Sequence, residues 1–374
     1  MKTIPLFKPS FHVDECLSEI RECLEKGWTG LGYKTLIMEE KWKEYTGLPY
    51  AHFLNSATAG LHLAVKILKD RHGWKDGDEV ISTPFTFVST NHAITYAGLK
   101  PVFADIDGTL NLNPGSVVSR ITPRTRAIMF VGIGGNAANF PEVREIGRKH
   151  GLKVILDAAH MAGTRIDGVH AGHGADVTVF SFHAVKNLPT ADSGMLCFSD
   201  EESDRMARRL SWLGIDLDTY SRSLKDDAYK WKYDVPCVGF KYHGNSVMAS
   251  LALVGLKYLD EDNGYRRRIA GWYAGALDEG PELSVVRHEG CESSRHLFQI
   301  LLENREAAII KLNRHGINPG VHYRDNREYP QYQEALDKCP ECVRLSGKVL
   351  SLPVHLGMTE DDVERIADVL KENG

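Results

Sequence analysis

The chain has 374 residues, of which 43% are hydrophobic and 25% charged, a composition that is ordinary for a soluble globular protein. This length exceeds what one hydrophobic core usually organises, so we expect two domains. The formal net charge of −5 argues against a nucleic-acid binder and against a protein that binds anionic membrane surfaces. No apolar run approaches the roughly 20 residues of a membrane span, and no signal peptide is recognisable, so no membrane association is expected.

The seven cysteines are an odd number without the spacing of a disulfide framework, which fits reduced thiols and predicts a cytoplasmic protein. Cys339 and Cys342 have CxxC spacing. Zinc would need further ligands beside them, and a redox function would need a thioredoxin-like context that the sequence lacks. We therefore predict no metal site.

The middle of the chain alternates between helical and strand patterns. Residues 54–70 read as a loop that enters an amphipathic helix, and 141–152 as a second helix. A helix and then a strand are expected within 90–107, and further strands at 78–85, 125–133, 153–159, 176–183 and 194–198. Alternating strands and helices joined by short loops indicate parallel strands with helices on both faces.

The pattern changes after about residue 245. A long helix is expected at 246–277, followed by strands at 296–303 and 318–323 and by helices at 304–316 and 359–372. The predicted fold class is α/β: a large domain over 1–245 with a mostly parallel sheet flanked by helices, and a smaller C-terminal α+β domain over 246–374.

Several chemically versatile residues follow predicted strands. Asp157 ends one strand, Ser181 and His183 end another, and Lys186 comes directly after them. In parallel α/β domains, ligands bind at the carboxyl ends of the strands. A lysine between two apparently buried strands is unusual, because removing its ammonium from water is costly. Either Lys186 extends to solvent or its amine is there to react.

The helix start at 55–60 offers free backbone N–H groups and small residues, which suit an anion. Phe87 adds an aromatic face near the same edge. Together these features suggest pyridoxal 5′-phosphate (PLP), with Thr58 and Ser181 at its phosphate and Lys186 as the residue that forms the Schiff base. Each feature also has an ordinary reading, as a helix cap, a turn residue, core packing or an exposed lysine.

Five blocks carry a resemblance to a known family. They are NSATAGLHLA (55–64), GDEVISTPFTFVSTNHAITYAGLKPVFADID (77–107), VILDAAH (154–160), VFSFHAVKN (179–187) and LSLPVH (350–355). Their order and content resemble the DegT/DnrJ/EryC1/StrS family of PLP-dependent sugar aminotransferases, which have fold type I. The resemblance runs over nearly the whole chain.

The resemblance implies roles for individual residues. Lys186 would be the catalytic lysine, which binds PLP and moves the proton, and Asp157 would keep the pyridine nitrogen protonated. Thr58, the Ala59 backbone N–H and Ser181 would bind the phosphate, and Phe87 would stack on the ring. The family also implies a homodimer with shared active sites, in which segment 239–245 of the partner reaches the phosphate.

Two positions depart from the common family pattern. His160 stands where glutamine is frequent, at a position that contacts the cofactor's ring oxygen, and histidine can still donate a hydrogen bond there. Lys241 stands where asparagine is frequent, and it could neutralise the phosphate as a point charge. The candidates for substrate binding are Gly30 in the 28–32 loop, His183, His322 and Tyr323.

The function implied is transfer of an amino group from glutamate or glutamine to a keto-sugar, which we expect to be nucleotide-linked, in amino-sugar biosynthesis for a surface polysaccharide such as lipopolysaccharide or for a natural product. Three alternatives stay open: a cyclitol ketone aminotransferase, a PLP-dependent sugar dehydratase and a non-catalytic PLP-binding regulator. The dehydratases have histidine in place of the lysine, so Lys186 disfavours that reading.

A metallohydrolase could be imagined from four histidines that lie close together in the sequence. These are His160, His170, His173 and His183. Their spacing matches no compact ligand motif, which disfavours a metal site built from them.

Overall fold

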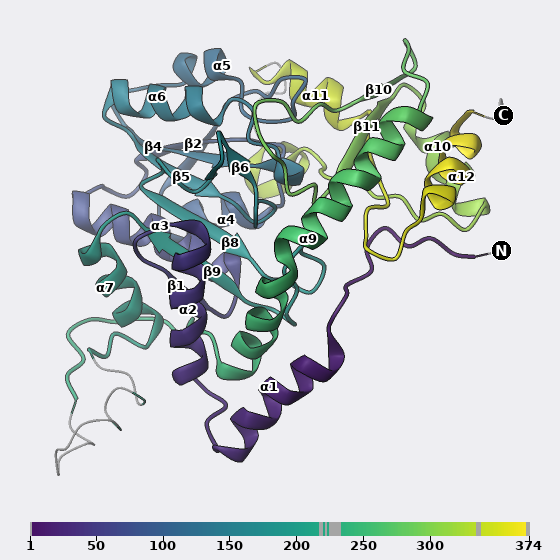
Figure 1. The fold of residues 1–374 in the computed structure, drawn as a ribbon. Helices are drawn as coiled ribbons and strands as arrows, with labels where there is room; N and C mark the ends of the chain where they lie inside the picture. Colours follow the sequence, from purple (N-terminus) through teal and green to yellow (C-terminus); the bar gives the residue numbers. More distant parts are fainter. Residues whose placement is uncertain (1, 217–219, 221–222, 224–232, 334–337, 372–374) are drawn as a thin grey trace.

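A computed structural model describes residues 2–216, 220, 223, 233–333 and 338–371 (Figure 1). Their strands form a seven-stranded sheet of order β1-β9-β8-β5-β4-β2-β3, a three-stranded sheet of order β10-β11-β12 and a two-stranded ribbon of β6 and β7. Helices cover the large sheet, so the predicted α/β fold class is confirmed. The domain boundary at 245/246 stays a prediction.

The strands are short and mostly buried. They are β1 (His52–Leu54), β2 (Glu79–Ser82), β3 (Lys100–Phe103), β4 (Thr125–Val131), β5 (Lys153–Asp157), β6 (Arg165–Ile166), β7 (Val169–His170), β8 (Val177–Ser181), β9 (Gly194–Phe198), β10 (Leu283–Val285), β11 (Phe298–Leu302) and β12 (Val349–Leu352).

The helices include two near the N-terminus that the sequence reading did not assign. The set is α1 (Val13–Glu25), α2 (Tyr33–Thr46), α3 (Ala57–His72), α4 (Ser89–Tyr96), α5 (Pro114–Ser119), α6 (Phe140–His150), α7 (Glu201–Ser211), α9 (Ser246–Ala276), α10 (Arg305–Arg314), α11 (Pro340–Ser346) and α12 (Glu360–Lys371), with 3₁₀ turns at Ile133–Gly135, Asn326–Glu328 and Pro330–Tyr332.

The two faces of the large sheet bury alternate residues of the same strand. In β4, Ile128 and Phe130 pack into a core with side chains of α2, α6 and α9, whereas Ala127 and Met129 pack into a core with α3, α4 and α7. Successive strand side chains point to opposite faces, so a strand that is covered on both sides reads as a continuous apolar run.

Strand β9 departs from the parallel arrangement that the alternation of strands and helices predicted. The neighbouring pairs among β3, β2, β4, β5 and β8 are parallel, but β9 is antiparallel to both β8 and β1. A parallel return needs a crossover, usually a helix. Residues 182–193 form turns instead, and this loop carries Lys186.

Helix α9 joins the two sheets. Its 31 residues span about 46 Å at the usual rise per residue. Near its middle, Asn263 accepts a hydrogen bond from Asn187 Nδ2 at 2.7 Å and donates one to Ala162 O at 2.9 Å. Ten residues later, Tyr273 stacks on Phe298 of β11 with the ring centroids 4.6 Å apart. The same helix therefore contacts the large-sheet region and the small sheet.

No strand forms at 318–323, so the prediction of one there is wrong. The segment makes a single bridge, from Gly320 to Ser351, and the residue before it, Ile317, makes another with Ile4. Beyond them the chain turns toward the large sheet, where the Asn326 N–H donates to Pro84 O at 2.8 Å.

His322 stays against the small sheet, where its Nδ1 lies 2.9 Å from Ser351 Oγ and its carbonyl accepts a hydrogen bond from Gln299 Nε2 at 2.7 Å. The Tyr323 ring lies near Phe87, with the centroids 6.0 Å apart.

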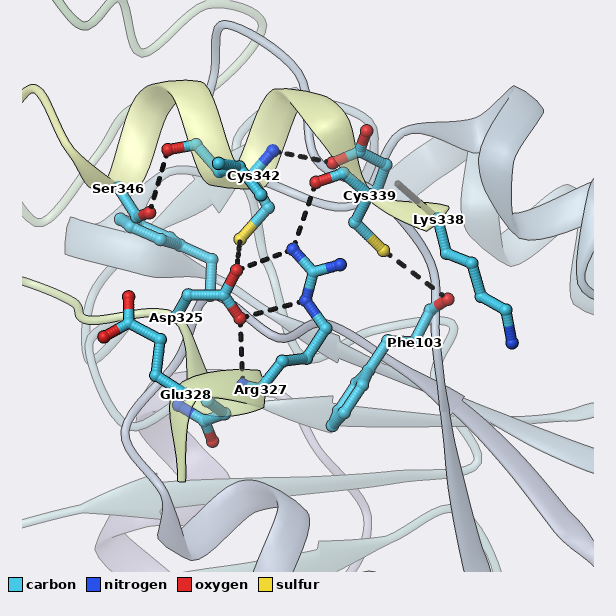
Figure 2. Close-up of polar contacts among 12 residues, drawn as sticks. Phe103, Asp325, Arg327, Glu328, Lys338, Cys339, Cys342 and Ser346 are labelled. Carbon is cyan, nitrogen blue, oxygen red and sulfur yellow. Dashed lines mark hydrogen bonds and ion pairs between the residues drawn. The ribbon is translucent and has the colours of Figure 1, made fainter. Parts of the chain in front are cut away.

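The two cysteines of the CxxC motif lie buried at the start of α11 (Figure 2). The Cys342 thiol donates to Asp325 Oδ2 at 3.4 Å, and the Cys339 thiol donates to Phe103 O at 3.8 Å. Asp325 also forms a buried ion pair with Arg327, with Oδ2 and Nη2 2.6 Å apart. Both thiols therefore belong to a buried polar cluster that ties α11 to the loop after residue 323.

Two further features concern what the described chain lacks. Within the described ranges, no helix is both long and apolar enough to cross a bilayer. In the same ranges, no group of three or more His, Cys, Asp or Glu side chains could hold a metal ion.

Candidate active site

A cavity of about 350 Å³ lies at the carboxyl ends of β5 and β8, where the 321–328 loop approaches the large sheet. Nine of the predicted site residues line it: Thr58, Phe87, Asp157, His160, Ser181, His183, Lys186, His322 and Tyr323. Parallel packing explains much of this convergence, because Asp157 pairs with Val179 across β5 and β8, two residues before Ser181.

Lys186 is half-buried in a turn in which its N–H donates to His183 O at 2.9 Å. Burial lowers the pKa of the Lys186 ammonium to about 8, and the Asp157 carboxylate opposes this shift. Desolvation disfavours the charged form of an amine. Lys186 can therefore be a neutral nucleophile or base near neutral pH.

Asp157 is buried at the end of β5, with only 4% of its surface exposed. Its Oδ2 accepts a hydrogen bond from Thr90 Oγ1 at 2.8 Å, and its Oδ1 accepts one from the Ala159 N–H at 3.1 Å. Burial raises the pKa of Asp157, and the two hydrogen bonds oppose that rise. A cationic group placed against this carboxylate would relieve the cost of burying its charge.

The N-terminus of α3 forms another part of the wall. Ser56 caps this helix, and its hydroxyl accepts a hydrogen bond from the Ala59 N–H at 3.2 Å. Thr58 lines the cavity, whereas Ala59 is buried behind it and is not among the lining residues. Ser181, which ends β8, also lines the cavity. The helix terminus and the two hydroxyls suit a bound phosphate.

His160 and Tyr323 contact each other in the lining of the cavity. His160 Nδ1 accepts a hydrogen bond from the Gly134 N–H at 3.1 Å, and its Nε2 lies 3.2 Å from the Tyr323 hydroxyl. Burial and the Lys186 charge hold the pKa of His160 well below its usual value, so the ring is neutral. Phe87 is 58% exposed, and its ring centroid lies 6.0 Å from that of Tyr323.

Two predicted residues lie outside the cavity of their own chain. Gly30 is exposed, and its carbonyl accepts hydrogen bonds from the Ser246 N–H at 2.9 Å and from the Ser246 hydroxyl at 2.7 Å. Lys241 is also exposed, with its Nζ 3.5 Å from the centroid of the Trp212 ring.

The sequence reading missed four residues that matter to this site. Phe7, Thr90, Asp192 and His296 all line the cavity. Thr90 follows Phe87 closely in a hydroxyl-rich run that enters α4, and that signal could have marked it. His296 is brought in by distant contacts, with Nδ1 2.9 Å from Asn187 Oδ1 and its ring 5.4 Å from that of Phe7. Nothing in the sequence around His296 points to it.

The four histidines of the metallohydrolase reading do not converge on this cavity. His170 packs against the rings of Trp42 and Phe180, at centroid distances of 6.3 and 5.3 Å. His173 Nε2 lies 2.9 Å from Thr46 O. His160 and His183 line the cavity without them.

The chain is similar to known proteins over nearly its whole length. The model of the DegT/DnrJ/EryC1/StrS aminotransferase family matches residues 12–371. The spore coat polysaccharide biosynthesis protein SpsC of Bacillus subtilis is 33% identical, with 96% of this chain and 94% of that protein covered.

Solved structures show the same similarity. The sugar aminotransferase Spr1654 from Streptococcus pneumoniae was solved in a PLP form and in a form with pyridoxamine 5′-phosphate (PMP). Both are 27% identical to this chain, with a TM-score of 0.90 and 99% of this chain covered. The match covers 98% of the PLP-form chain and 97% of the PMP-form chain. DesI, solved in the presence of its TDP-sugar product, is 28% identical with a TM-score of 0.87, and the match covers 99% of this chain and 92% of DesI.

The cavity fits PLP on its own chemistry. The lysine with a lowered pKa matches the aldehyde of PLP, and the buried carboxylate matches its ring nitrogen. The two hydroxyls near a helix N-terminus match its phosphate. Bound there, PLP would supply the electron sink on which an amino group is exchanged. The chain belongs to the DegT/DnrJ/EryC1/StrS family of PLP-dependent aminotransferases.

Proposed function

We propose that this aminotransferase moves an amino group from glutamate or glutamine to a nucleotide-linked keto-sugar, in the cytoplasm, during the synthesis of a surface polysaccharide or a natural product. The observation that carries the proposal is Lys186, whose pKa burial lowers to about 8 beside Asp157 in the cavity. The sugar class is supported by SpsC, which is named for spore coat polysaccharide biosynthesis, and by DesI with its TDP-sugar product.

In this proposal each cavity residue has a definite task. Lys186 holds the cofactor and then carries the proton at its Nζ. Asp157 stabilises the charge of the ring nitrogen, while Thr58 and Ser181 bind the phosphate and Phe87 packs on the ring face. His183, His322 and Tyr323 face the substrate. The Ala59 N–H already serves the Ser56 cap, so Thr58 and Ser181 take the larger share of phosphate binding.

We further propose that two copies of the chain share each site. Lys241 and Gly30 lie outside the cavity of their own chain, and Lys241 is exposed, which fits a residue that acts in the cavity of a partner. The Lys241 ammonium would then neutralise the phosphate as a point charge. The homodimer is therefore required for activity in this proposal.

The visible spectrum of the purified protein with PLP tests the donor step. We expect an absorption band of bound PLP that converts to the PMP form when L-glutamate or L-glutamine is added. The PMP form can then be titrated with nucleotide-linked keto-sugars and with a cyclitol ketone, and the substrate that restores the PLP band defines the acceptor class.

Two variants sharpen this experiment. Lys186→Ala should still bind PLP weakly but should not convert it, because the base is gone. Lys257→Ala is the control, since Lys257 lies on α9 in an exposed ion pair with Glu15. Turnover by Lys186→Ala near the wild-type rate would contradict the proposal. If neither amino acid changes the PLP band, the proposed donors are refuted and a PLP-binding regulator is favoured.

A further inference from the structure

The hydrogen bond from Thr90 to Asp157 is the last in a longer series. Thr90 Oγ1 donates to Asp157 Oδ2 at 2.8 Å, and it lies 2.9 Å from Thr86 Oγ1. A hydroxyl has a single proton. The proton of Thr90 points to the ionised Asp157, so Thr90 can only accept from Thr86. The series therefore runs one way, from Thr86 through Thr90 to Asp157.

Both threonines of this series are buried, and both are among the residues that line the cavity of Lys186. Hydrogen bonds in such a low-dielectric setting polarise one another. The donor at Thr86 therefore strengthens the bond that Thr90 makes to the carboxylate. The charge on Asp157 thus depends on a hydroxyl that donates to Thr90 and not to Asp157 itself.

Asn326, in the 321–328 loop, fixes the backbone of Thr86. Its Nδ2 donates to Thr86 O at 2.7 Å, and its Oδ1 accepts from Asn91 Nδ2 at 2.9 Å. Asn91 Nδ2 also donates to Thr83 O at 3.1 Å. Backbone carbonyls only accept hydrogen bonds, so both amides can have only this orientation. Asn326 therefore joins the segment that carries Thr86 to a loop 240 residues away in the chain.

The loop that carries Asn326 is itself fixed on both sides. The Asn326 N–H donates to Pro84 O at 2.8 Å, and Asp325 forms a β-bridge with Phe85. The buried pair of Asp325 and Arg327 fixes the turn that follows (Figure 2). Backbone contacts and an ion pair therefore hold the Asn326 amide against Thr86.

We propose that Thr86 and Asn326 are positioning residues of the cofactor site, which act through Thr90. The Thr86 hydroxyl supports the bond by which Thr90 keeps Asp157 charged, and Asn326 holds that hydroxyl in place. This inference rests on the proposed task of Asp157 at the ring nitrogen. Burial raises the pKa of Asp157, and the Thr90 bond opposes that rise, so each donor in the series favours the carboxylate.

Matched substitutions separate hydrogen bonding from the filling of space. Thr86→Val keeps the branched shape and removes the donor, whereas Thr86→Ser keeps the donor. Asn326→Leu removes the amide at similar volume. Thr178→Val is the control, because its buried hydroxyl donates to Gly172 O at 3.1 Å and Thr178 does not line the cavity. Both valine variants lose a buried hydrogen bond, but only Thr86→Val should affect Asp157.

The first test needs neither cofactor nor substrate. The protein is labelled with ¹³C at its aspartate carboxyl carbons, and the Asp157 signal is assigned by its loss in Asp157→Asn. We expect NMR titration to give a higher pKa of Asp157 in Thr86→Val and in Asn326→Leu than in wild type, because the carboxylate loses support. Thr86→Ser and Thr178→Val should leave this pKa unchanged.

The titration can overturn each part of the inference separately. An unchanged pKa of Asp157 in Thr86→Val would overturn the hydroxyl series, whatever the enzyme's substrate is. An unchanged pKa in Asn326→Leu would overturn the role of Asn326. Asn326→Ser also lacks the amide, and it replaces Asn326→Leu in this test if the leucine variant does not fold.

The second test measures PLP affinity from the visible band of the bound cofactor. Thr86→Val should weaken binding about threefold, which is less than the loss expected for Thr90→Val, because Thr86 acts at one remove from the carboxylate. Thr86→Ser and Thr178→Val should bind PLP like wild type. Wild-type affinity in Thr86→Val would contradict the proposed support of Asp157.

A double variant distinguishes a series from two independent effects. If Thr86 acts only through Thr90, Thr86→Val should cause no further loss of PLP affinity in a Thr90→Val background. Additive losses would show that Thr86 acts on the site directly and would overturn the positioning role. If Asp157→Asn binds PLP as tightly as wild type, the proposed task of Asp157 is refuted instead, whereas the titration of Asp157 tests the hydrogen-bond series independently.

Discussion

Thr90 Oγ1 donates a hydrogen bond to Asp157 Oδ2 at 2.8 Å, and it links the start of α4 to the end of β5 in the lining of the cavity. Thr90→Val keeps the shape of the side chain but removes this donor, which helps Asp157 to remain charged. Hydrogen bonds to charged groups are worth about 1.5–3 kcal/mol, so we expect PLP affinity to fall at least about tenfold.

Titration of the visible PLP band gives that affinity directly. Thr90→Ser retains the hydroxyl and should bind PLP nearly as well as wild type. Thr95→Val removes a hydroxyl from the same helix that donates to Asn91 O at 3.2 Å and does not line the cavity, and it should have no effect on PLP affinity. Equal affinities for Thr90→Val and wild type would show that Ala159 alone suffices to hold Asp157.

The lowered pKa of Lys186 predicts how cofactor capture depends on pH. Only the neutral amine can bond to the aldehyde carbon of PLP, and Lys186 is neutral above its pKa of about 8. The rate of capture should therefore rise with pH through a midpoint near 8 and then level off. Stopped-flow absorbance between about pH 6 and 10 measures it, where an unperturbed lysine would titrate near 10.4.

Asp157→Asn tests whether the Asp157 carboxylate raises the pKa of Lys186. The Asp157 carboxylate raises the Lys186 pKa against the effect of burial, so its neutralisation should move the midpoint to lower pH. A midpoint that moves upward in Asp157→Asn would contradict the effect assigned to the Asp157 carboxylate. A wild-type midpoint near the ordinary lysine value would contradict the lowering by desolvation.

The ion pair between Asp325 and Arg327 predicts a large loss of stability when one partner is removed. Their side chains are 2% and 0% exposed. Asp325→Ala removes the buried carboxylate that pairs with the Arg327 guanidinium, and breaking a buried ion pair typically costs about 3–5 kcal/mol of unfolding free energy. Thermal and urea midpoints measure the change.

An exposed pair on α6 is the matched control for that variant. Glu145 and Arg148 have 59% and 76% of their side chains exposed, and Glu145→Ala should leave both midpoints nearly unchanged. Similar midpoints for Asp325→Ala and Glu145→Ala would mean that the Cys342 and Arg327 region relaxes to readmit water.

Shared sites predict complementation between two damaged chains. In the proposed dimer, each site takes Lys186 from one copy and Lys241 from the other. When Lys186→Ala and Lys241→Ala proteins are unfolded and refolded together in equal amounts, half of the dimers should be mixed. Each mixed dimer has one complete site, so about a quarter of the wild-type rate should return. No recovery, despite mixed dimers in native mass spectra, would exclude a shared site.

The sequence predicted what local patterns encode. The apolar run of β5 ending in Asp157, the capped helix after Ser56 and the lysine after β8 are all visible within a few residues. These features, together with the family's sequence blocks, were sufficient to predict nine of the residues that line the cavity.

What the sequence did not predict depends on contacts between distant segments. The antiparallel direction of β9 follows from a loop that turns back, which the alternation of strands and helices does not encode. The 318–323 segment has strand-like residues, but hydrogen bonds from Asn326 draw its end toward the large sheet. His160 Nδ1 accepts its hydrogen bond from the backbone of Gly134, 26 residues away.

The contacts along helix α9 limit where residues can be inserted into this chain or deleted from it. Asn263 fits against Asn187 and Ala162, and Tyr273 fits against Phe298, on one continuous helix. One residue inserted between these two positions would rotate the later half by about 100° and advance it by about 1.5 Å. Insertions and deletions should therefore accumulate in the surface loops of relatives, whereas the ten-residue interval from Asn263 to Tyr273 should keep its length.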